Sequence, residues 1–294
     1  MKAPELLAPA GSLAMLKTAF DFGADAVYAG QPRYSLRVRN NDFGSLEVLK
    51  EGIDHAHSRN KHFYLVSNIF PHGAKTRTYV RDMTPVMELK PDALIMSDPG
   101  LIMLIRENWP DMPIHLSVQA NTVNGHAAKF WRSVGVSRVI LSRELSLDEI
   151  EAVRQDCPEM EIEVFIHGAL CVAYSGQCFI SHAHTGRSAN RGNCSQECRL
   201  PYTVKDAEGR IIAHDKHVLS LKDNDQSANL EALVDAGVRC FKIEGRYKDM
   251  ATVKNVTAHY RQLFDAVLER RPEFSRGSSG RSTYTFTPQP EQGF

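Results

Sequence analysis

Short apolar runs alternate along most of the chain with longer amphipathic stretches. Eight runs are predicted to be strands: 5–10, 25–30, 62–68, 92–98, 114–120, 138–144, 162–168 and 240–246. Their central positions are mostly apolar, which is typical of parallel strands covered on both faces. Between them lie segments of helical periodicity, and Ser12, Ser45 and Ser146 are the N-caps expected for three of these helices.

Eight strands, each followed by a helix, predict a (β/α)8 TIM-like barrel over residues 1–270. A doubly wound open sheet is the alternative, because the same alternation produces both folds. The regularity breaks only between the seventh and eighth strands, where residues 169–224 form a cysteine-rich insertion. Residues 249–270 are expected to form the last helix. Residues 271–294 are rich in Gly, Ser, Thr and Pro and predict a linker or tail that could lead to a further domain.

Composition narrows the function. The length of 294 residues suits an α/β barrel, which typically has about 250. Lys plus Arg and Asp plus Glu both total 35, which argues against a protein that coats nucleic acid non-specifically. No signal peptide or run of about 20 apolar residues is present, so we expect a cytoplasmic location without membrane contact. The sequence makes no prediction of oligomeric state.

Four of the six cysteines lie close together in the insertion. Cys171, Cys178, Cys194 and Cys198 follow the spacing Cys-x6-Cys-x15-Cys-x3-Cys. In a reducing compartment, such cysteines are metal ligands, catalytic groups or buried thiols rather than disulfides. Zinc sites usually combine two short Cys pairs, and only the second pair here is short. The glycines between the ligands favour an iron–sulfur cluster, while buried thiols and a structural zinc module that binds RNA stay open.

Polar residues gather where the predicted strands end, which is the active face of a barrel. The candidates at these ends are Tyr28, Asn68, Gln119, Asn121, Arg143, Glu144, His167, Lys242, Glu244 and Arg246. Period-2 alternation places Lys242, Glu244 and Arg246 on one face of the last strand, where they either close the barrel as a charge network or act on a ligand. Arg143 and Glu144 are adjacent, so at most one should face the pocket. Glu5 begins the first strand and is expected in the lower barrel.

The stretch EVFIHGALCVAYSGQCFIS (163–181) resembles the signature of the collagenase-like peptidase family U32. The similarity extends over most of the chain through PELLAPAGS, ADAVYAG, SVQANTVN, SREL, NRGNCSQECRLPY and KIEGR. Within the family, the chain is most similar to members that hydroxylate the wobble uridine of tRNA to 5-hydroxyuridine. The resemblance therefore implies prephenate as co-substrate, the tRNA anticodon loop as partner, and oxygen-independent hydroxylation. It also implies a 4Fe-4S cluster held by the residues matching Cys171, Cys178, Cys194 and Cys198.

These implications give the strand-end residues candidate roles. Prephenate has two carboxylates, which Arg143 and Arg246 would bind, because guanidinium groups pair with carboxylates in a bidentate manner. A pyrimidine edge needs an amide or an acid, and the candidates are Asn68, Gln119, Asn121 and Glu144, with Tyr28 as a further substrate contact. The catalytic candidates are His167 for proton transfer, Glu144, Glu244 and Lys242. Tyr34 and Tyr174 could stack on bases. The alternative function is a cysteine or metal-dependent peptidase, in which Cys171 as nucleophile and His167 as base would form the thiol version.

Overall fold

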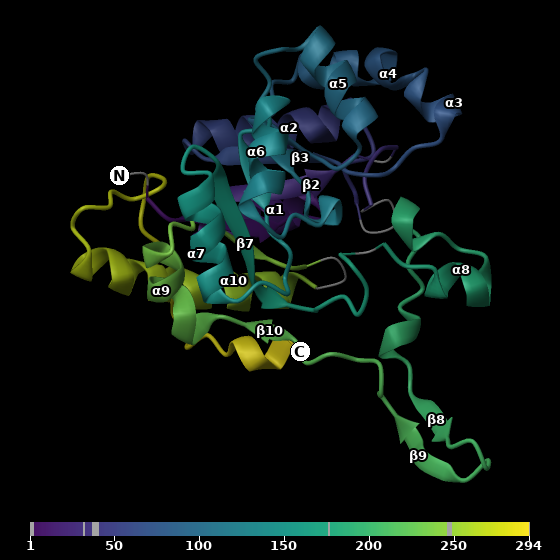
Figure 1. Ribbon diagram of the computed structural model, residues 1–294. Helices are drawn as coiled ribbons and strands as arrows, with labels where there is room; N and C mark the ends of the chain where they lie inside the picture. Colours follow the sequence, from purple (N-terminus) through teal and green to yellow (C-terminus); the bar gives the residue numbers. More distant parts are fainter. Residues whose placement is uncertain (1–2, 32, 37–40, 176, 246–248, 294) are drawn as a thin grey trace.

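Eight parallel strands close into a barrel in the computed structural model, which describes residues 3–31, 33–36, 41–175, 177–245 and 249–293 (Figure 1). The barrel strands are β1 (Glu5–Pro9), β2 (Ala26–Gly30), β3 (His62–Ser67), β4 (Ala93–Met96), β5 (Ile114–Leu116), β6 (Arg138–Ile140), β7 (Glu161–Gly168) and β11 (Cys240–Ile243). Neighbours pair in the order β7-β11-β1-β2-β3-β4-β5-β6, and a further β6–β7 pairing completes the ring. This closure confirms the predicted barrel, because a doubly wound sheet would keep two open edges.

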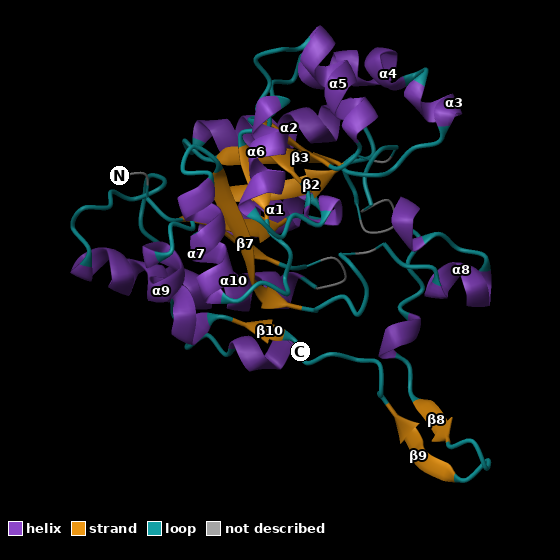
Figure 2. Cartoon of the chain, viewed as in Figure 1, coloured by secondary structure: helices purple, strands orange, loops and turns teal. Residues whose placement is uncertain are grey.

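Helices surround the strands, as Figure 2 shows. Serine side chains begin three of them as expected, since Ser12, Ser45 and Ser146 each accept a hydrogen bond from a backbone N–H three residues later. The helices that follow barrel strands or cover the barrel are α1 (Leu13–Asp21), α2 (Leu46–Ser58), α3 (Gly73–Thr76), α4 (Tyr79–Met87), α5 (Pro99–Asn108), α6 (Gly125–Ser133), α7 (Leu147–Asp156), α9 (Leu230–Asp235) and α10 (Met250–Arg270). No helix in the described ranges is long and apolar enough to cross a membrane.

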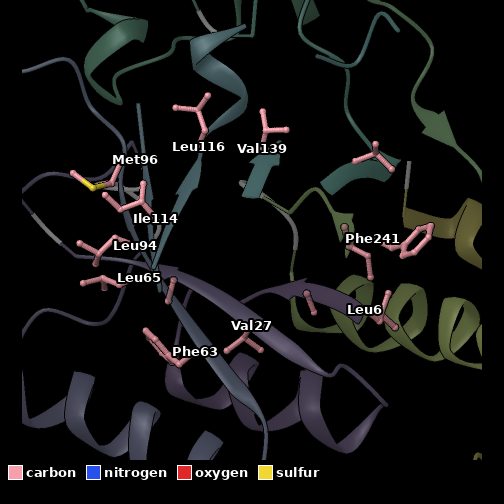
Figure 3. Packing of buried hydrophobic residues seen from close by; sticks show 14 of the residues in the cluster. Leu6, Val27, Phe63, Leu65, Leu94, Met96, Ile114, Leu116, Val139 and Phe241 are labelled. Atoms are coloured by element: carbon pink, nitrogen blue, oxygen red, sulfur yellow. The ribbon is translucent and has the colours of Figure 1, made fainter. Parts of the chain in front are cut away.

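Alternate residues of each strand enter two separate cores. The outward side chains, among them Val27, Phe63 and Leu94, pack with the helices in the larger apolar cluster (Figure 3). The inward side chains form a smaller cluster that includes Leu7, Tyr64, Ile95 and Ile140. Alternation along each strand therefore decides which side chains can reach the barrel interior.

Charged side chains fill the N-terminal end of the barrel interior. Arg138 Nη1 lies 2.9 Å from Glu5 Oε1 and 3.4 Å from Glu163 Oε2, and Lys242 Nζ lies 2.9 Å from Glu163 Oε1. Glu5 thus occupies the lower barrel, as expected. Burial alone would raise the pKa of Glu5, but Arg138 and hydrogen bonds with His62 and Tyr64 lower it far below its ordinary range.

The insertion follows β7 and projects from the barrel (Figure 1). It contains α8 (Ile180–Thr185), the 3-10 turns η2 (Ala189–Arg191) and η3 (Glu197–Arg199), and a hairpin of β8 (Tyr202–Lys205) and β9 (Ile211–Lys216). The chain then returns through β10 (Asn224–Asp225), which pairs antiparallel with the end of β7, and η4 (Ser227–Asn229). The insertion therefore lies between the seventh and eighth barrel strands, as predicted.

The segment after α10, predicted as a linker or tail, lies along the barrel. Phe274 is buried, Ser278 Oγ donates to Asp25, and Tyr284 donates to the carbonyl of Phe22. Gln289 N donates to Asn255 on α10 just before the short turn η5 (Pro290–Gly293). That this segment leads to a further domain stays a prediction.

His115 on β5 should make the stability depend on pH in the mildly acidic range. Burial, with a further contribution from Arg138, lowers the pKa of His115 well below its ordinary value near 6.5. The unfolded chain therefore takes up a proton as the pH falls below about 6.5, while the folded chain does not, and stability is lost in that direction. We expect His115→Gln to remove about 1.4 kcal/mol per pH unit of this loss between pH 6.5 and 5, measured by urea unfolding.

The matched control is His126→Gln, because His126 is exposed on α6. That variant should lose stability with falling pH as steeply as the parent protein. An unchanged slope in His115→Gln would show that His115 is not the titrating group.

Candidate active site

A cavity of about 430 Å³ lies at the C-terminal ends of the strands, between the barrel and the insertion. Barrel residues form its floor, and the insertion supplies its rim. The floor includes Tyr28, Val66, Asn68, Ile95, Gln119, Ile140, Arg143, Phe165, Lys242 and Glu244, and the rim includes Leu170, Cys171, Cys194, Cys198 and Arg199. The fold therefore joins the predicted strand-end residues and the cysteine loop in one space.

Two ion pairs carry the charge of the cavity floor. Lys242 Nζ pairs with Glu163 below and lies 4.2 Å from the centre of the Tyr28 ring. Arg143 Nη2 donates to Glu244 Oε2 at 2.8 Å, and its guanidinium carbon lies 3.8 Å from the centre of the Phe165 ring. Each cation already has a carboxylate partner, so the cavity can accept a carboxylate ligand only by sharing or exchanging these pairs.

Amide side chains line another part of the floor. Asn68 is held at both ends, because its Oδ1 accepts from Leu36 N at 3.1 Å and its Nδ2 donates to Ser117 Oγ at 3.2 Å. Gln119 is held only at Oε1, which accepts from Ser97 Oγ at 3.2 Å. Gln119 Nε2 donates to no residue in the described part of the chain. Gln119 therefore offers the cavity an unused hydrogen-bond donor, whereas the amide of Asn68 mainly holds the surrounding loops.

Four of the predicted site residues are not placed at this cavity by the described structure. Glu144 is exposed in the turn that follows β6, and Asn121 has a φ of 51° as it ends the turn η1 (Val118–Ala120). His167 is 2% exposed and faces α10, where its Nδ1 lies 3.3 Å from the hydroxyl of Tyr260. Arg246 lies outside the described residues. The roles predicted for these four stay predictions.

The four cysteines of the insertion are half-buried and form no disulfide. Cys171, Cys194 and Cys198 line the cavity. Burial raises the pKa of Cys198, Arg199 opposes this, and Cys171, Cys194 and Cys178 raise it further. Within the described ranges, no three His, Cys, Asp or Glu side chains are close enough to hold a single metal ion.

Arg199 connects separate parts of the insertion. Its Nη1 donates to Ser220 Oγ at 2.6 Å and to the carbonyl of Leu221 at 2.9 Å, and its Nη2 donates to the carbonyl of Leu170 at 2.9 Å. Arg199 follows Cys198 and Leu170 precedes Cys171, so one guanidinium fixes the two outer cysteines relative to each other. Only its position next to Cys198 could have indicated this role from the sequence. Phe165 was also missed. It lies two residues after Glu163 on β7, so the strand period could have placed it on the same interior face.

The aromatic residues expected to stack on bases have different surroundings. Tyr34 is buried, donates to Asp82 at 2.7 Å and packs edge-on against Tyr79, so the prediction that it stacks on RNA is wrong. Tyr174 in the insertion is 63% exposed and stays available. Phe179, which the sequence did not single out, is exposed close to it along the chain.

Comparison with known proteins places this barrel in a family. The model of peptidase family U32 matches residues 11–292. The chain belongs to this family. The U32 chain is 49% identical over 290 residues to the 23S rRNA 5-hydroxycytidine C2501 synthase of Escherichia coli. The aligned region covers 99% of this chain and 44% of that protein. It is 46% identical over 315 aligned residues to tRNA hydroxylation protein P of Escherichia coli. This alignment covers 92% of this chain and 69% of that protein.

The likeness to solved structures concerns the fold. The structure of the U32 peptidase Mk0906 superposes with a TM-score of 0.54 at 13% identity, over 83% of this chain and 94% of that one. The U32 chain spans less than half the length of the rRNA-modifying relative, so the activities of the relatives are considered below as proposals.

Arg199 should control the order of the insertion. Arg199→Met removes three hydrogen bonds from a charged donor, each typically worth about 1.5–3 kcal/mol. We expect limited proteolysis between residues 169 and 224 to accelerate at least about tenfold, because cleavage follows the population of the locally opened state.

The control is Arg210→Met, because Arg210 pairs only with Asp206 and Glu208 within its own hairpin, among the described residues. Its cleavage between residues 169 and 200 should match that of the parent protein. Equal rates for the Arg199 variant and the parent would contradict the connecting role of Arg199.

Proposed function

We propose that this chain is the catalytic barrel of an RNA hydroxylase, and that it converts the wobble uridine of tRNA to 5-hydroxyuridine. The observation that carries the proposal is the cavity that combines a free amide donor, two paired cations and a cysteine rim. Two relatives of this chain are named for hydroxylating RNA. An enzyme that modifies a base takes it out of the stack into such a pocket.

Gln119 is the residue proposed to contact the edge of the base. Its free Nε2 is a donor, which matches the 4-carbonyl of uracil, and its Oε1 is held by Ser97. Rotation of the amide by half a turn would present Oε1 instead, which matches the 4-amino group of cytosine. Cytidine of ribosomal RNA is therefore the second candidate substrate, favoured by the 49% identity that extends over 99% of the chain.

Prephenate is proposed as the co-substrate at the cation pairs. Its two carboxylates suit the guanidinium of Arg143 and the ammonium of Lys242, which both line the cavity. Phe165 lies beneath Arg143 and offers an apolar surface to the ring of the ligand. Glu244 Oε2, released from Arg143 by such an exchange, is proposed to accept a hydrogen bond from the bound ligand.

A 4Fe-4S cluster is proposed to be held by Cys171, Cys178, Cys194 and Cys198. What supports it is the donor set, which consists of four half-buried free cysteines, three of which line the cavity rim. When bound, the cluster would supply one-electron chemistry at the cavity rim, and the hydroxylation is proposed to be independent of molecular oxygen. The backbone N–H of Cys178 donates to Asn190 at 3.0 Å, which holds the second ligand loop.

The peptidase alternative needs Cys171 and His167 to work as a pair. Cys171 lines the cavity, whereas the His167 ring packs edge-on against Tyr260 of α10 at 5.6 Å between ring centres. A nucleophile and its base must lie within hydrogen-bond reach. The geometry therefore favours the hydroxylase.

The substrate is tested by mass spectrometry of nucleosides from a strain that lacks the gene. We expect 5-hydroxyuridine to disappear from tRNA, to return with the parent gene, and to fall at least about 100-fold with Arg143→Met, because a lost charge-assisted contact costs about 3 kcal/mol or more. The exposed Arg132→Met on α6 is the matched control and should restore the base fully. If only 5-hydroxycytidine of 23S rRNA is lost, cytidine of ribosomal RNA is the substrate instead of tRNA uridine. If neither modified base changes, both candidate substrates are refuted.

The cluster is tested by anaerobic purification followed by iron, sulfide and zinc analysis. The parent protein and Cys157→Ala should contain about four iron atoms per chain, since Cys157 is buried beyond α7, away from the cavity rim. Serine at any of the four proposed ligands should lower the iron content severalfold. A colourless protein that contains zinc would instead support the structural zinc module.

A further inference from the structure

A second cavity of about 360 Å³ lies at the opposite face of the barrel. Arg59 and Lys61, which line it, directly precede β3, and Gly23 precedes β2, so this cavity is at the N-terminal ends of the strands. The segment 276–282, which follows α10, forms its other wall. Neither the barrel mouth nor the cysteine insertion contributes to it.

Positive charge exceeds negative charge around this second cavity. Five cations, Arg59, Lys61, Arg261, Arg276 and Arg281, are set against three carboxylates, Asp21, Asp25 and Asp265. Asp21 itself lines the cavity but is paired with Arg59. Arg281 is exposed and forms no ion pair or hydrogen bond with any residue that the structure describes. The cavity therefore has an excess of two positive charges.

Lys61 is a buried cation with hydrogen-bonding capacity to spare. It is 7% exposed, and its ammonium donates to the carbonyl of Ala24 and to Ser278 Oγ. An ammonium has three N–H donors, and the third has no acceptor among the described residues. Burial lowers the pKa of Lys61, Asp25 opposes this, and Arg261, Arg276 and Arg59 lower it again. An anion in the cavity would relieve this repulsion.

The wall segment 276–282, with the sequence RGSSGRS, presents backbone donors. Hydroxyls of Ser278, Ser279 and Ser282 donate to Asp25, to the Arg59 carbonyl and to the Asp21 carbonyl, and these bonds fix the segment. The backbone N–H groups of residues 278–282 donate to no described acceptor. Gly280 has a φ of 85°, a left-handed conformation of the kind that turns successive N–H groups toward an anion.

We infer that this second cavity binds a small phosphorylated anion, with its phosphate group between Arg281, Arg276 and Lys61. The volume suits one small molecule. A phosphate of an RNA that enters the barrel mouth would have to reach the opposite face, so the free anion is the favoured source. The inference does not depend on the proposed hydroxylase function.

The inference is tested on the full purified chain with inorganic phosphate as probe. Calorimetric titration at constant ionic strength should show phosphate binding to the parent protein. We expect Arg281→Ala and Arg276→Gln each to weaken it about tenfold or more, since each removes a charged donor. The matched control Arg132→Ala, an exposed arginine on α6, should bind as the parent does. Crystals grown with phosphate should show density between Arg281 and Lys61.

Two results would overturn the inference. Equal phosphate affinity in the parent protein and in both cavity variants would place any bound phosphate elsewhere. Displacement of phosphate by tRNA, with tRNA affinity reduced by Arg281→Ala, would show that this surface binds an RNA backbone instead of a small anion.

Discussion

The buried charges within the barrel constrain the rest of the structure. Arg138 reaches across the interior from β6 to Glu5 on β1, and it shares Glu163 of β7 with Lys242 of β11. A buried charge left without its partner costs about 3–5 kcal/mol, so these four strands must keep the register that brings the pairs together. The same pairs hold the Lys242 side chain at the cavity floor, and in this way the closure of the barrel positions a charge of the site.

The cavity above this network is built from groups that are already partly satisfied. Arg143 has Glu244, Lys242 has Glu163 and Asn68 has two loop partners, while Gln119 keeps a free donor. Such a site selects ligands that can replace the existing ion pairs and hydrogen bonds. A ligand that cannot replace them would leave a buried cation or carboxylate unpaired.

Much of the fold and part of the site follow from local patterns. Apolar runs marked all eight barrel strands, serine caps marked three helix starts, and alternation placed Lys242 and Glu244 on the interior face. Alternation along β7 could also have revealed Phe165. The contacts of His167 with α10 and the burial of Tyr34 against Tyr79 could not be predicted, because they depend on helices that pack from elsewhere in the chain.

The sequence by itself determined which residues of the regular strands face the barrel interior, since the two-residue period of a strand is a property of its own backbone. The irregular end of β7, where His167 contacts α10, is the exception. It also determined that four cysteines enter at one point, after the seventh strand. Only the tertiary structure decided the partners: Glu163 for Lys242, Glu244 for Arg143, and Leu170 for Arg199. These pairs join residues 29 to 101 positions apart. Local periodicity determines the direction in which each strand side chain points, but its contact partner depends on how the barrel closes.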